Sequence, residues 1–269
     1  MSITDLIRSR RSVRTFDGRP LSEEDRGKLQ AYIDSLPEAF GVPVTFRILD
    51  AGEHDLSSPV VVGADVYVAV KGKRQPNVEL AFGYSFEKLC LYALSLGVGT
   101  VMLAASISRG TFEKAMAVGE DEVMPCASPL GYPADKRSLR EKAMRLALRA
   151  DDRIAFDKLF FDGSFDRPLT EQAAGSFRDA LEAVRWAPSA TNKQPWRAVL
   201  DGERVHFYEK QTIPTSPLGD IQKLDVGIGL AHFELTAREQ GIGGGFVFDD
   251  PGLTAPEGTR YIITWDSQA

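Results

Sequence analysis

The sequence predicts an α+β fold that occurs twice in one chain, with the two related halves packed together as an internal pseudo-dimer. Two observations carry this prediction. The segment FDGRPLS at 16–22 returns as FDGSFDRPLT at 161–170, with three residues inserted. A constant shift of 144 positions also relates three glycine pairs, namely Gly83 and Gly227, Gly97 and Gly241, and Gly99 and Gly243. Their shared order indicates a duplication, and two halves of like fold pack most simply as a two-fold homodimer does.

Each FDG segment leads into the same series of expected elements. A hydroxyl residue followed by acidic or amide residues marks a helix start, an amphipathic helix follows, a proline ends it, and an aromatic–arginine pair opens an apolar strand. These features are Ser22, a helix over 28–36, Pro37 and Phe46 in the first half, and Thr170, a helix over 177–187, Pro188 and Trp196 in the second.

The uncharged stretch 89–107 is long enough to resemble a membrane span. Glycines interrupt it, however, and its counterpart in the second half contains Arg238 and Glu239. We therefore expect a helix through Leu96, a glycine stop at Gly97 and a buried strand over 100–104.

The halves are expected to cover residues 1–135 and 160–269, with a connector rich in Lys and Arg over 136–159. The chain has 269 residues, 43% of them hydrophobic, which is typical of a globular protein. Its net charge of −6 argues against a general nucleic-acid binder. Two distant cysteines support neither a disulfide framework nor a zinc site. The N-terminus lacks the apolar core of a signal peptide, so we expect a cytoplasmic protein without a membrane partner.

The halves differ in two places, and each half has kept what the other lost. RRSVRT at 10–15 stands opposite AFDKLF at 155–160, which has no arginine or serine. PSATNKQPW at 188–196 stands opposite PEAFGVPVTF at 37–46, where the hydroxyl and amide groups are gone. Arginine forks and a serine hydroxyl are suited to phosphate or to an electron-rich ring edge. Neutral donors and acceptors on a proline-framed turn are suited to a polar heterocycle. The alternatives are a solvated basic stretch and a well-capped turn.

Other motifs give no function. GIGGG at 241–245 is not GxGxxG and ends a helix, so it is interpreted as a helix stop. There is no GxSxG, no HExxH and no nucleophile motif beside the three histidines, and His206 is expected to pack within a strand. The lack of an obvious acid, base or nucleophile is consistent with a flavoenzyme, because a flavin carries the redox chemistry itself.

RRSVRTF near the N-terminus, followed by APSATNKQPW after a helix and by Gly131-Tyr132-Pro133, resembles the flavin-dependent nitroreductase family. The duplication is most similar to the tandem, single-chain branch of that family. The resemblance implies a mixed α/β sandwich whose flavin mononucleotide (FMN) lies between the two halves. It also implies NAD(P)H as the co-substrate and a nitroaromatic, quinone or similar small molecule as the electron acceptor.

The resemblance also implies a set of cofactor-binding residues drawn from both halves. These are Arg10, Arg11, Ser12, Arg14, Ala105 and Ser106 from the first half, and Pro188, Ser189, Asn192 and Gln194 from the second. The arginines would grip the phosphate and place positive charge near the N1–C2=O edge, which stabilises the anionic reduced flavin. A further phosphate contact is expected from one of Lys136, Arg137, Arg140 and Arg145. No residue is assigned as proton donor.

A homodimer of this kind has two flavin sites, whereas a fused pseudo-dimer with reciprocal losses keeps one. We therefore expect one flavin in each chain, which is expected to be monomeric. Two alternatives stay open: a flavin-binding sensor or carrier without turnover, and a relic of the fold that binds no flavin.

Overall fold

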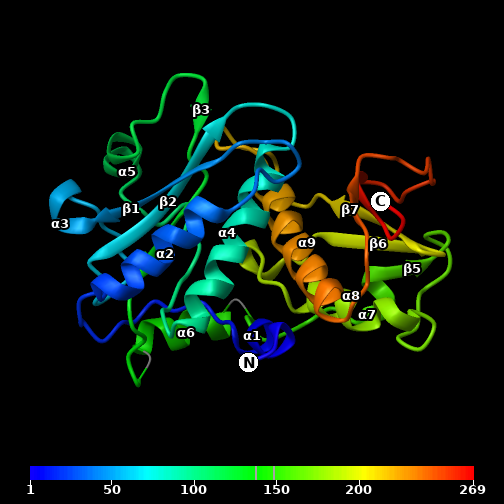
Figure 1. The fold of residues 1–269 in the computed structure, drawn as a ribbon, viewed down its shortest axis with the longest axis horizontal. Helices are drawn as coiled ribbons and strands as arrows, with labels where there is room; N and C mark the ends of the chain where they lie inside the picture. The colour runs from blue at the N-terminus through cyan, green and yellow to red at the C-terminus, as the bar shows by residue number, and fades with distance from the viewer. Residues whose placement is uncertain (137, 148) are drawn as a thin grey trace.

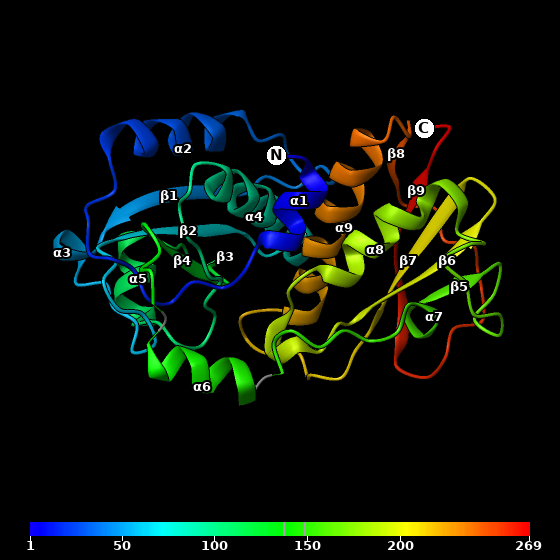
Figure 2. The same cartoon turned by 90° about the horizontal axis from the view of Figure 1, so that it is seen from below.

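The structure is a computed structural model that describes residues 1–136, 138–147 and 149–269. Two antiparallel-rich sheets lie on either side of a central pair of helices, α4 (Val78–Ser95) and α9 (Ile221–Glu239) (Figures 1 and 2). The first-half sheet lies on one side of this pair and the second-half sheet on the other. The chain is therefore a mixed α/β sandwich, as the sequence predicts.

In the first half, β1 (Thr45–Asp50) pairs antiparallel with β2 (Val66–Lys73), and β2 pairs antiparallel with β4 (Ala127–Leu130). The short strand β3 (Glu122–Val123) pairs with the end of β2. A bridge between Leu103 and Ala127 places the segment after α4 next to β4.

In the second half, the order is β5-β6-β7-β9-β8. These strands are β5 (Phe160–Asp162), β6 (Trp196–Asp201), β7 (Arg204–Lys210), β8 (Gly245–Val247) and β9 (Thr259–Asp266). The order β6-β7-β9-β8 repeats the first-half order of β1, β2, β4 and the segment around Leu103, with α4 and α9 at equivalent places in the chain. The repeated topology confirms the internal duplication.

The predicted helices form with small shifts at their ends. The helix expected over 28–36 is α2 (Glu23–Ser35), and the helix expected over 177–187 is α8 (Arg178–Trp186). Helix α4 stops before Gly97, whose φ of 76° is the left-handed conformation that glycine adopts readily. The strand expected over 100–104 is wrong in detail, because that segment makes only isolated bridges beside β4.

The remaining helices are short. They are α1 (Ile3–Ser9), α3 (Ala51–His54), α5 (Arg109–Ala115), α6 (Leu139–Ala147), α7 (Phe156–Leu159) and the 3-10 turns η1 (Gly175–Phe177) and η2 (Ala190–Asn192). None of the helices in the described part of the chain is long and apolar enough to span a bilayer.

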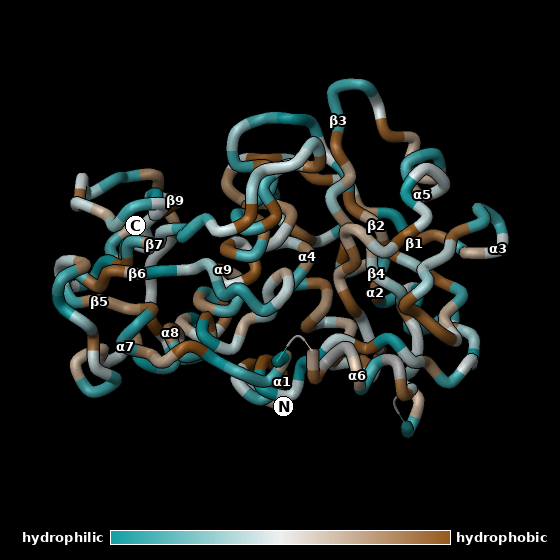
Figure 3. Tube along the Cα trace, turned by 180° about the vertical axis from the view of Figure 1, so that it is seen from behind, coloured by the Kyte–Doolittle hydropathy of each residue, from teal (hydrophilic) through white to brown (hydrophobic). Residues whose placement is uncertain are grey.

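The main core is continuous from one half to the other and has α4 and α9 at its centre. Figure 3 shows hydrophobic residues along the inner strands and hydrophilic residues along the outer loops. Glycine lets the two central helices touch, since a Cβ atom on Gly83 would lie 1.9 Å from the carbonyl oxygen of Leu224. The two halves therefore share one core and form a single packed unit.

Candidate functional site

A cavity of about 580 Å³ lies between the halves. Its size falls within the range of roughly 300–1,000 Å³ typical of small-molecule sites. The first half lines it with residues 8–12, Arg14, 102–104 and Ser106. The second half lines it with residues 188–192 and with one side of α9. The two stretches that differ between the halves, which are about 180 residues apart in the sequence, thus meet at one cavity.

Helix α1 carries the arginine stretch to this position. Ser2 caps the helix, with its hydroxyl accepting from the backbone N–H of Asp5 at 3.0 Å. Leu6 and Ile7 are buried in a small cluster with Leu91 of α4 and Ala183 of α8. The N-terminal helix of the first half therefore packs on the second half, and the chain leaves it at Arg10 beside the cavity.

Arg10 is anchored by a buried carboxylate. Its Nε lies 2.8 Å from Oε1 of Glu87, and the two side chains are 5% and 0% exposed. Nε2 of His232 lies 2.9 Å from the same oxygen. Glu87 balances the charge of Arg10 and holds its guanidinium group in one orientation. Arg10 therefore adds little net positive charge to the cavity.

The connector holds the arginine stretch from outside. Glu141 of α6 is 3% exposed, and its Oε2 accepts hydrogen bonds from the backbone N–H of Arg14 at 3.3 Å and from the hydroxyl of Thr15 at 2.9 Å. On the inner side, the N–H of Val13 donates to the carbonyl of Thr100 at 2.9 Å. Arg14 is thus fixed through its backbone between the connector and the first-half sheet.

The amides of the PSATNKQPW turn hold the other end of the connector. Nδ2 of Asn192 donates to the carbonyls of Arg149 at 2.7 Å and of Asp152 at 3.1 Å. Oε1 of Gln194 accepts from the N–H of Ile154 at 2.9 Å. These contacts account for two of the polar side chains whose density makes this turn conspicuous in the sequence.

Most of the residues expected at the cofactor lie around the cavity. Those that line it are Arg10, Arg11, Ser12, Arg14, Ser106, Pro188, Ser189 and Asn192. Ala105 is exposed and Gln194 is buried, and neither belongs to the lining. Of the expected phosphate partners, Lys136 is exposed and outside the lining. Arg137 and the side chains of Arg140 and Arg145 lie outside the described part of the structure.

The sequence did not point to several other lining residues. Trp186 at the end of α8 forms part of the wall, and the guanidinium carbons of Arg8 and Arg153 lie 5.3 Å and 5.2 Å from the centre of its ring. Stacked arginines of this kind are stabilised by the negative face of the indole. The only sequence feature that points to Arg8 is its position, two residues before the arginine stretch that begins at Arg10.

Asp225 of α9 is the other lining residue that the sequence did not indicate. Its side chain is buried, and its Oδ2 accepts a hydrogen bond from the backbone N–H of Ala190 at 2.9 Å. Burial raises the pKa of this carboxyl well above its ordinary value. Asp225 thus ties the start of η2 to α9.

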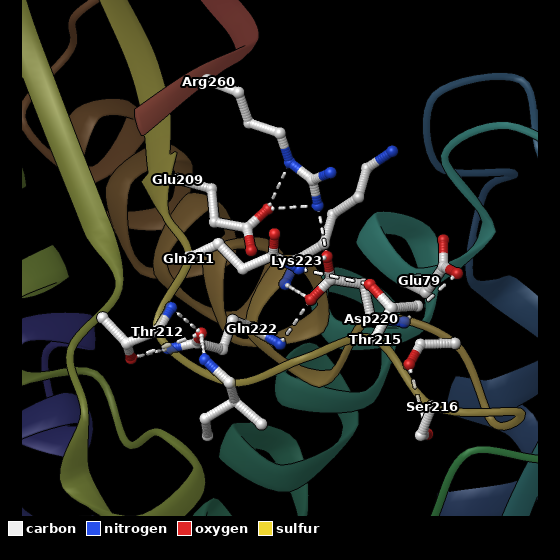
Figure 4. A network of polar contacts seen from close by, with 12 residues as sticks. Glu79, Glu209, Gln211, Thr212, Thr215, Ser216, Asp220, Gln222, Lys223 and Arg260 are labelled. Carbon is white, nitrogen blue, oxygen red and sulfur yellow. Dashed lines mark hydrogen bonds and ion pairs between the residues drawn. The ribbon is translucent and has the colours of Figure 1, made fainter. Parts of the chain in front are cut away.

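An ionic network fixes the start of α9 before Asp225 (Figure 4). Asp220 caps the helix, because its Oδ1 accepts from the N–H groups of Gln222 at 3.0 Å and Lys223 at 3.1 Å. Arg260 of β9 bonds to Asp220 and to Oε2 of Glu209. The sheet of the second half therefore holds the helix that forms one wall of the cavity.

A family model described as Putative TM nitroreductase matches residues 2–237. The chain belongs to this nitroreductase family. A search of curated proteins finds no match.

Among solved structures, a putative nitroreductase from Thermotoga maritima has a TM-score of 0.66 at 19% identity, and the match covers 100% of this chain and 95% of that one. An FMN-dependent nitroreductase from Clostridium difficile has a TM-score of 0.42 at 14% identity, over 49% of this chain and 88% of that one. A putative NADH dehydrogenase/NAD(P)H nitroreductase from Bacteroides thetaiotaomicron has a TM-score of 0.43 at 25% identity, over 51% and 89%.

The chain has a second place where a cavity would be expected from its pseudo-symmetry. Four lining residues correspond to four aromatic residues, one pair by the shift of 151 positions that relates Pro37 to Pro188 and three pairs by the shift of 144 positions. The pairs are Thr191 with Phe40, Ile228 with Tyr84, Met102 with Phe246, and Ala104 with Phe248.

The four aromatic residues pack together at that place. The ring of Phe40 lies 5.1 Å from that of Tyr84, 5.8 Å from that of Phe246 and 6.5 Å from that of Phe248, all in edge-on geometry. The backbone beneath them has not changed. Phe40 and Gly41 have φ values of 57° and 70°, and their counterparts Thr191 and Asn192 have 48° and 56°. The chain thus has two equivalent turns, of which one lines a cavity and the other carries the cluster of Phe40, Tyr84, Phe246 and Phe248, called the aromatic plug below.

The cavity combines charged, hydroxyl and apolar groups. Arg11, Ser12 and Arg14 offer charged and hydroxyl donors, while Met102 and Ile228 offer apolar surface. Such a combination of apolar walls with a few convergent polar groups is typical of cofactor sites. Across the described residues, no group of three or more His, Cys, Asp or Glu side chains is arranged to hold a metal ion.

Proposed function

We propose that this chain is an FMN-dependent oxidoreductase that passes hydride from NAD(P)H through the flavin to a nitroaromatic, quinone or similar acceptor. One observation carries the proposal: the arginine stretch of the first half and the PSATNKQPW turn of the second half line the same cavity. The flavin, when bound, supplies the hydride chemistry.

The residues of the chain bind and orient the cofactor. Arg11, Ser12 and Arg14 would hold the phosphate, since guanidinium groups bind phosphate oxygens in pairs. Ser189 is held in place by the N–H of Gln194, which donates to its hydroxyl at 2.9 Å, so its oxygen is fixed at the cavity wall. Trp186 and Ile228 would exclude water from the ring, which strengthens the polar contacts made there.

Each chain would hold one flavin. The aromatic plug occupies the second, pseudo-symmetric place, and residues 155–160 supply no arginine there. Both walls of the surviving site come from one chain, so we expect a monomer to be competent. One of the four basic connector residues named above would add a phosphate contact.

The experiment is to incubate the purified protein with FMN, desalt it, and count bound flavin per chain from the absorbance spectrum. We expect close to one equivalent. NADH and NADPH are then added under anaerobic conditions, and bleaching of the flavin band is followed, with a quinone and a nitroaromatic as acceptors.

Each result separates two functions. Retained flavin that is bleached by a nicotinamide and restored by an acceptor supports the oxidoreductase. Retained flavin that neither nicotinamide reduces indicates a sensor or carrier instead. No retained flavin, with the protein folded, overturns the proposal of an FMN protein and favours a relic of the fold.

A further inference from the structure

Asp225 is a buried acid on the wall of the cavity that the proposed chemistry does not use. Its side chain is 3% exposed, and it belongs to the lining. Within the described part of the chain, its carboxyl makes one hydrogen bond, which Oδ2 accepts from the N–H of Ala190. A carboxyl group has two oxygens, so Oδ1 remains for a partner in the cavity.

The acid occurs in only one of the two halves. A shift of 144 positions relates Asp225 to Ala81 of α4, which is buried and has no polar group on its side chain. The acid thus occurs only at the open cavity, as the arginine stretch and the polar turn do.

The surroundings of Asp225 disfavour a charged carboxylate. Leu224, Ile228 and Cys126 share its part of the lining. Arg10 is bound to Glu87, and Glu209 and Asp220, the charged groups that act on Asp225, are themselves acidic. An isolated ionised carboxylate in such a place is costly, so burial raises the pKa of Asp225. The N–H of Ala190 acts in the opposite direction, while Glu209 and Asp220 add to the effect of burial, and the pKa is raised on balance.

We propose that Asp225 is a further ligand-binding residue, which donates a hydrogen bond from a neutral carboxylic acid to an acceptor atom of the flavin. The isoalloxazine ring offers carbonyl oxygens and ring nitrogens as such acceptors. This inference rests on the proposed function, because it names a contact to the same cofactor. A neutral donor at this wall selects an electron-rich ring edge and disfavours a ligand that presents a donor there.

The test measures FMN affinity by quenching of flavin fluorescence, from mildly acidic to mildly alkaline pH, with the full-length protein. In the wild type, affinity weakens as pH rises and the acid ionises, because the donor is lost and a negative charge appears. Asp225→Asn keeps an oxygen for Ala190 and gains a neutral N–H donor, so we expect its affinity to match the wild type at low pH and to lose that part of the pH dependence. Asp225→Leu removes the donor and should weaken binding by about tenfold at low pH.

Three outcomes oppose the proposal. An Asp225→Leu variant that binds FMN as tightly as the wild type shows that the acid makes no contact. An Asp225→Asn variant that binds FMN more tightly at every pH shows that the wild-type acid is charged in the complex. If Asp225→Leu does not fold, Asp225→Asn decides alone, since a pH profile identical to that of the wild type also overturns the proposal. If the folded wild type binds no FMN at any pH, the proposed function itself is wrong. This outcome is distinct from a failure of the role of Asp225, which requires a wild type that does bind FMN.

Discussion

Gly83 and Gly227 occupy equivalent positions in the two central helices, and each faces a backbone carbonyl of the other helix. A Cβ atom on Gly83 would lie 1.9 Å from the carbonyl oxygen of Leu224, and one on Gly227 would lie 2.2 Å from that of Leu80. The contact is reciprocal under the 144-residue shift, as a two-fold interface requires. The glycine pair found in the sequence thus marks the pseudo-two-fold axis.

Replacing Gly83 by Ala should therefore force the helices apart. We expect a loss of at least about 1–3 kcal/mol in the free energy of unfolding, measured by urea denaturation, because overpacking a tight contact displaces backbone. Gly27→Ala is the matched control, since no atom lies within 4 Å of a Cβ at that helical position. The control should be neutral or more stable, by up to about 1 kcal/mol. Equal stability of the two variants would contradict the close contact between α4 and α9 at Gly83.

The ion pair of Arg10 and Glu87 predicts that one arginine of the stretch matters for folding and its neighbour does not. Arg10→Ala leaves Glu87 buried with His232 alone and should lower the unfolding free energy by about 3–5 kcal/mol. Arg11 is exposed, so Arg11→Ala should change stability by less than about 0.5 kcal/mol while weakening FMN binding. Adding Glu87→Gln to Arg10→Ala should restore part of the stability. If Arg11→Ala is more destabilising than Arg10→Ala, the ion pair of Arg10 and Glu87 is not what makes this stretch important for folding.

Asn192 should control how often the connector opens. Asn192→Gly keeps the left-handed backbone but removes the hydrogen bonds to the carbonyls of Arg149 and Asp152. We expect roughly thirtyfold faster trypsin cleavage within the connector, because each of the two lost bonds contributes about 1 kcal/mol to local opening. Lys193→Gln, at the exposed neighbouring position, is the control and should leave the cleavage pattern within 136–159 unchanged. Cleavage at the wild-type rate would show that these bonds do not hold the connector.

The aromatic plug predicts the result of copying it into the open cavity. Ala104→Phe places a ring where the second half has Phe248, and we expect at least a tenfold loss of FMN affinity with the fold retained. Phe40→Ala removes a ring on the other side and should lower stability without changing flavin content from one per chain. Far-ultraviolet circular dichroism checks the fold of both variants. Unchanged FMN binding by Ala104→Phe would place the flavin elsewhere.

Asp225 also predicts a pH dependence of stability in the protein without flavin. The pKa of its carboxyl is raised in the folded state, mainly by burial, so the folded chain binds more protons than the unfolded chain between the ordinary and the raised pKa. Its contribution to stability is complete below the ordinary pKa and is lost as pH rises through the raised one. Urea denaturation of wild type and Asp225→Asn over this range should show a smaller fall in the variant. Because Glu209 titrates in both proteins, parallel curves would mean that Asp225 does not contribute.

The duplication and the meeting of the two polar stretches could be predicted from the sequence, because both depend on short sequence segments that can be compared between the halves. The repeat of FDG segments and glycines predicts the duplication, and the reciprocal losses predict a single site. Glu87 and Asp225 could not be predicted in this way. They stand in nearly continuous buried helices, where periodicity carries no information on which face meets a cavity. The roles of Asn192 and Gln194 depend on the path of the connector, which no local pattern specifies.

The connector has one more consequence, for the response of the molecule to dilution. A homodimer with its cofactor between the subunits loses the site whenever the subunits separate, so its activity depends on protein concentration. Here residues 136–159 tether the two walls, and the second wall is present at a high effective concentration however few molecules there are. The proposed site would therefore stay assembled at any protein concentration. Each chain is also free to alter one wall at a time, because no identical partner has to change with it.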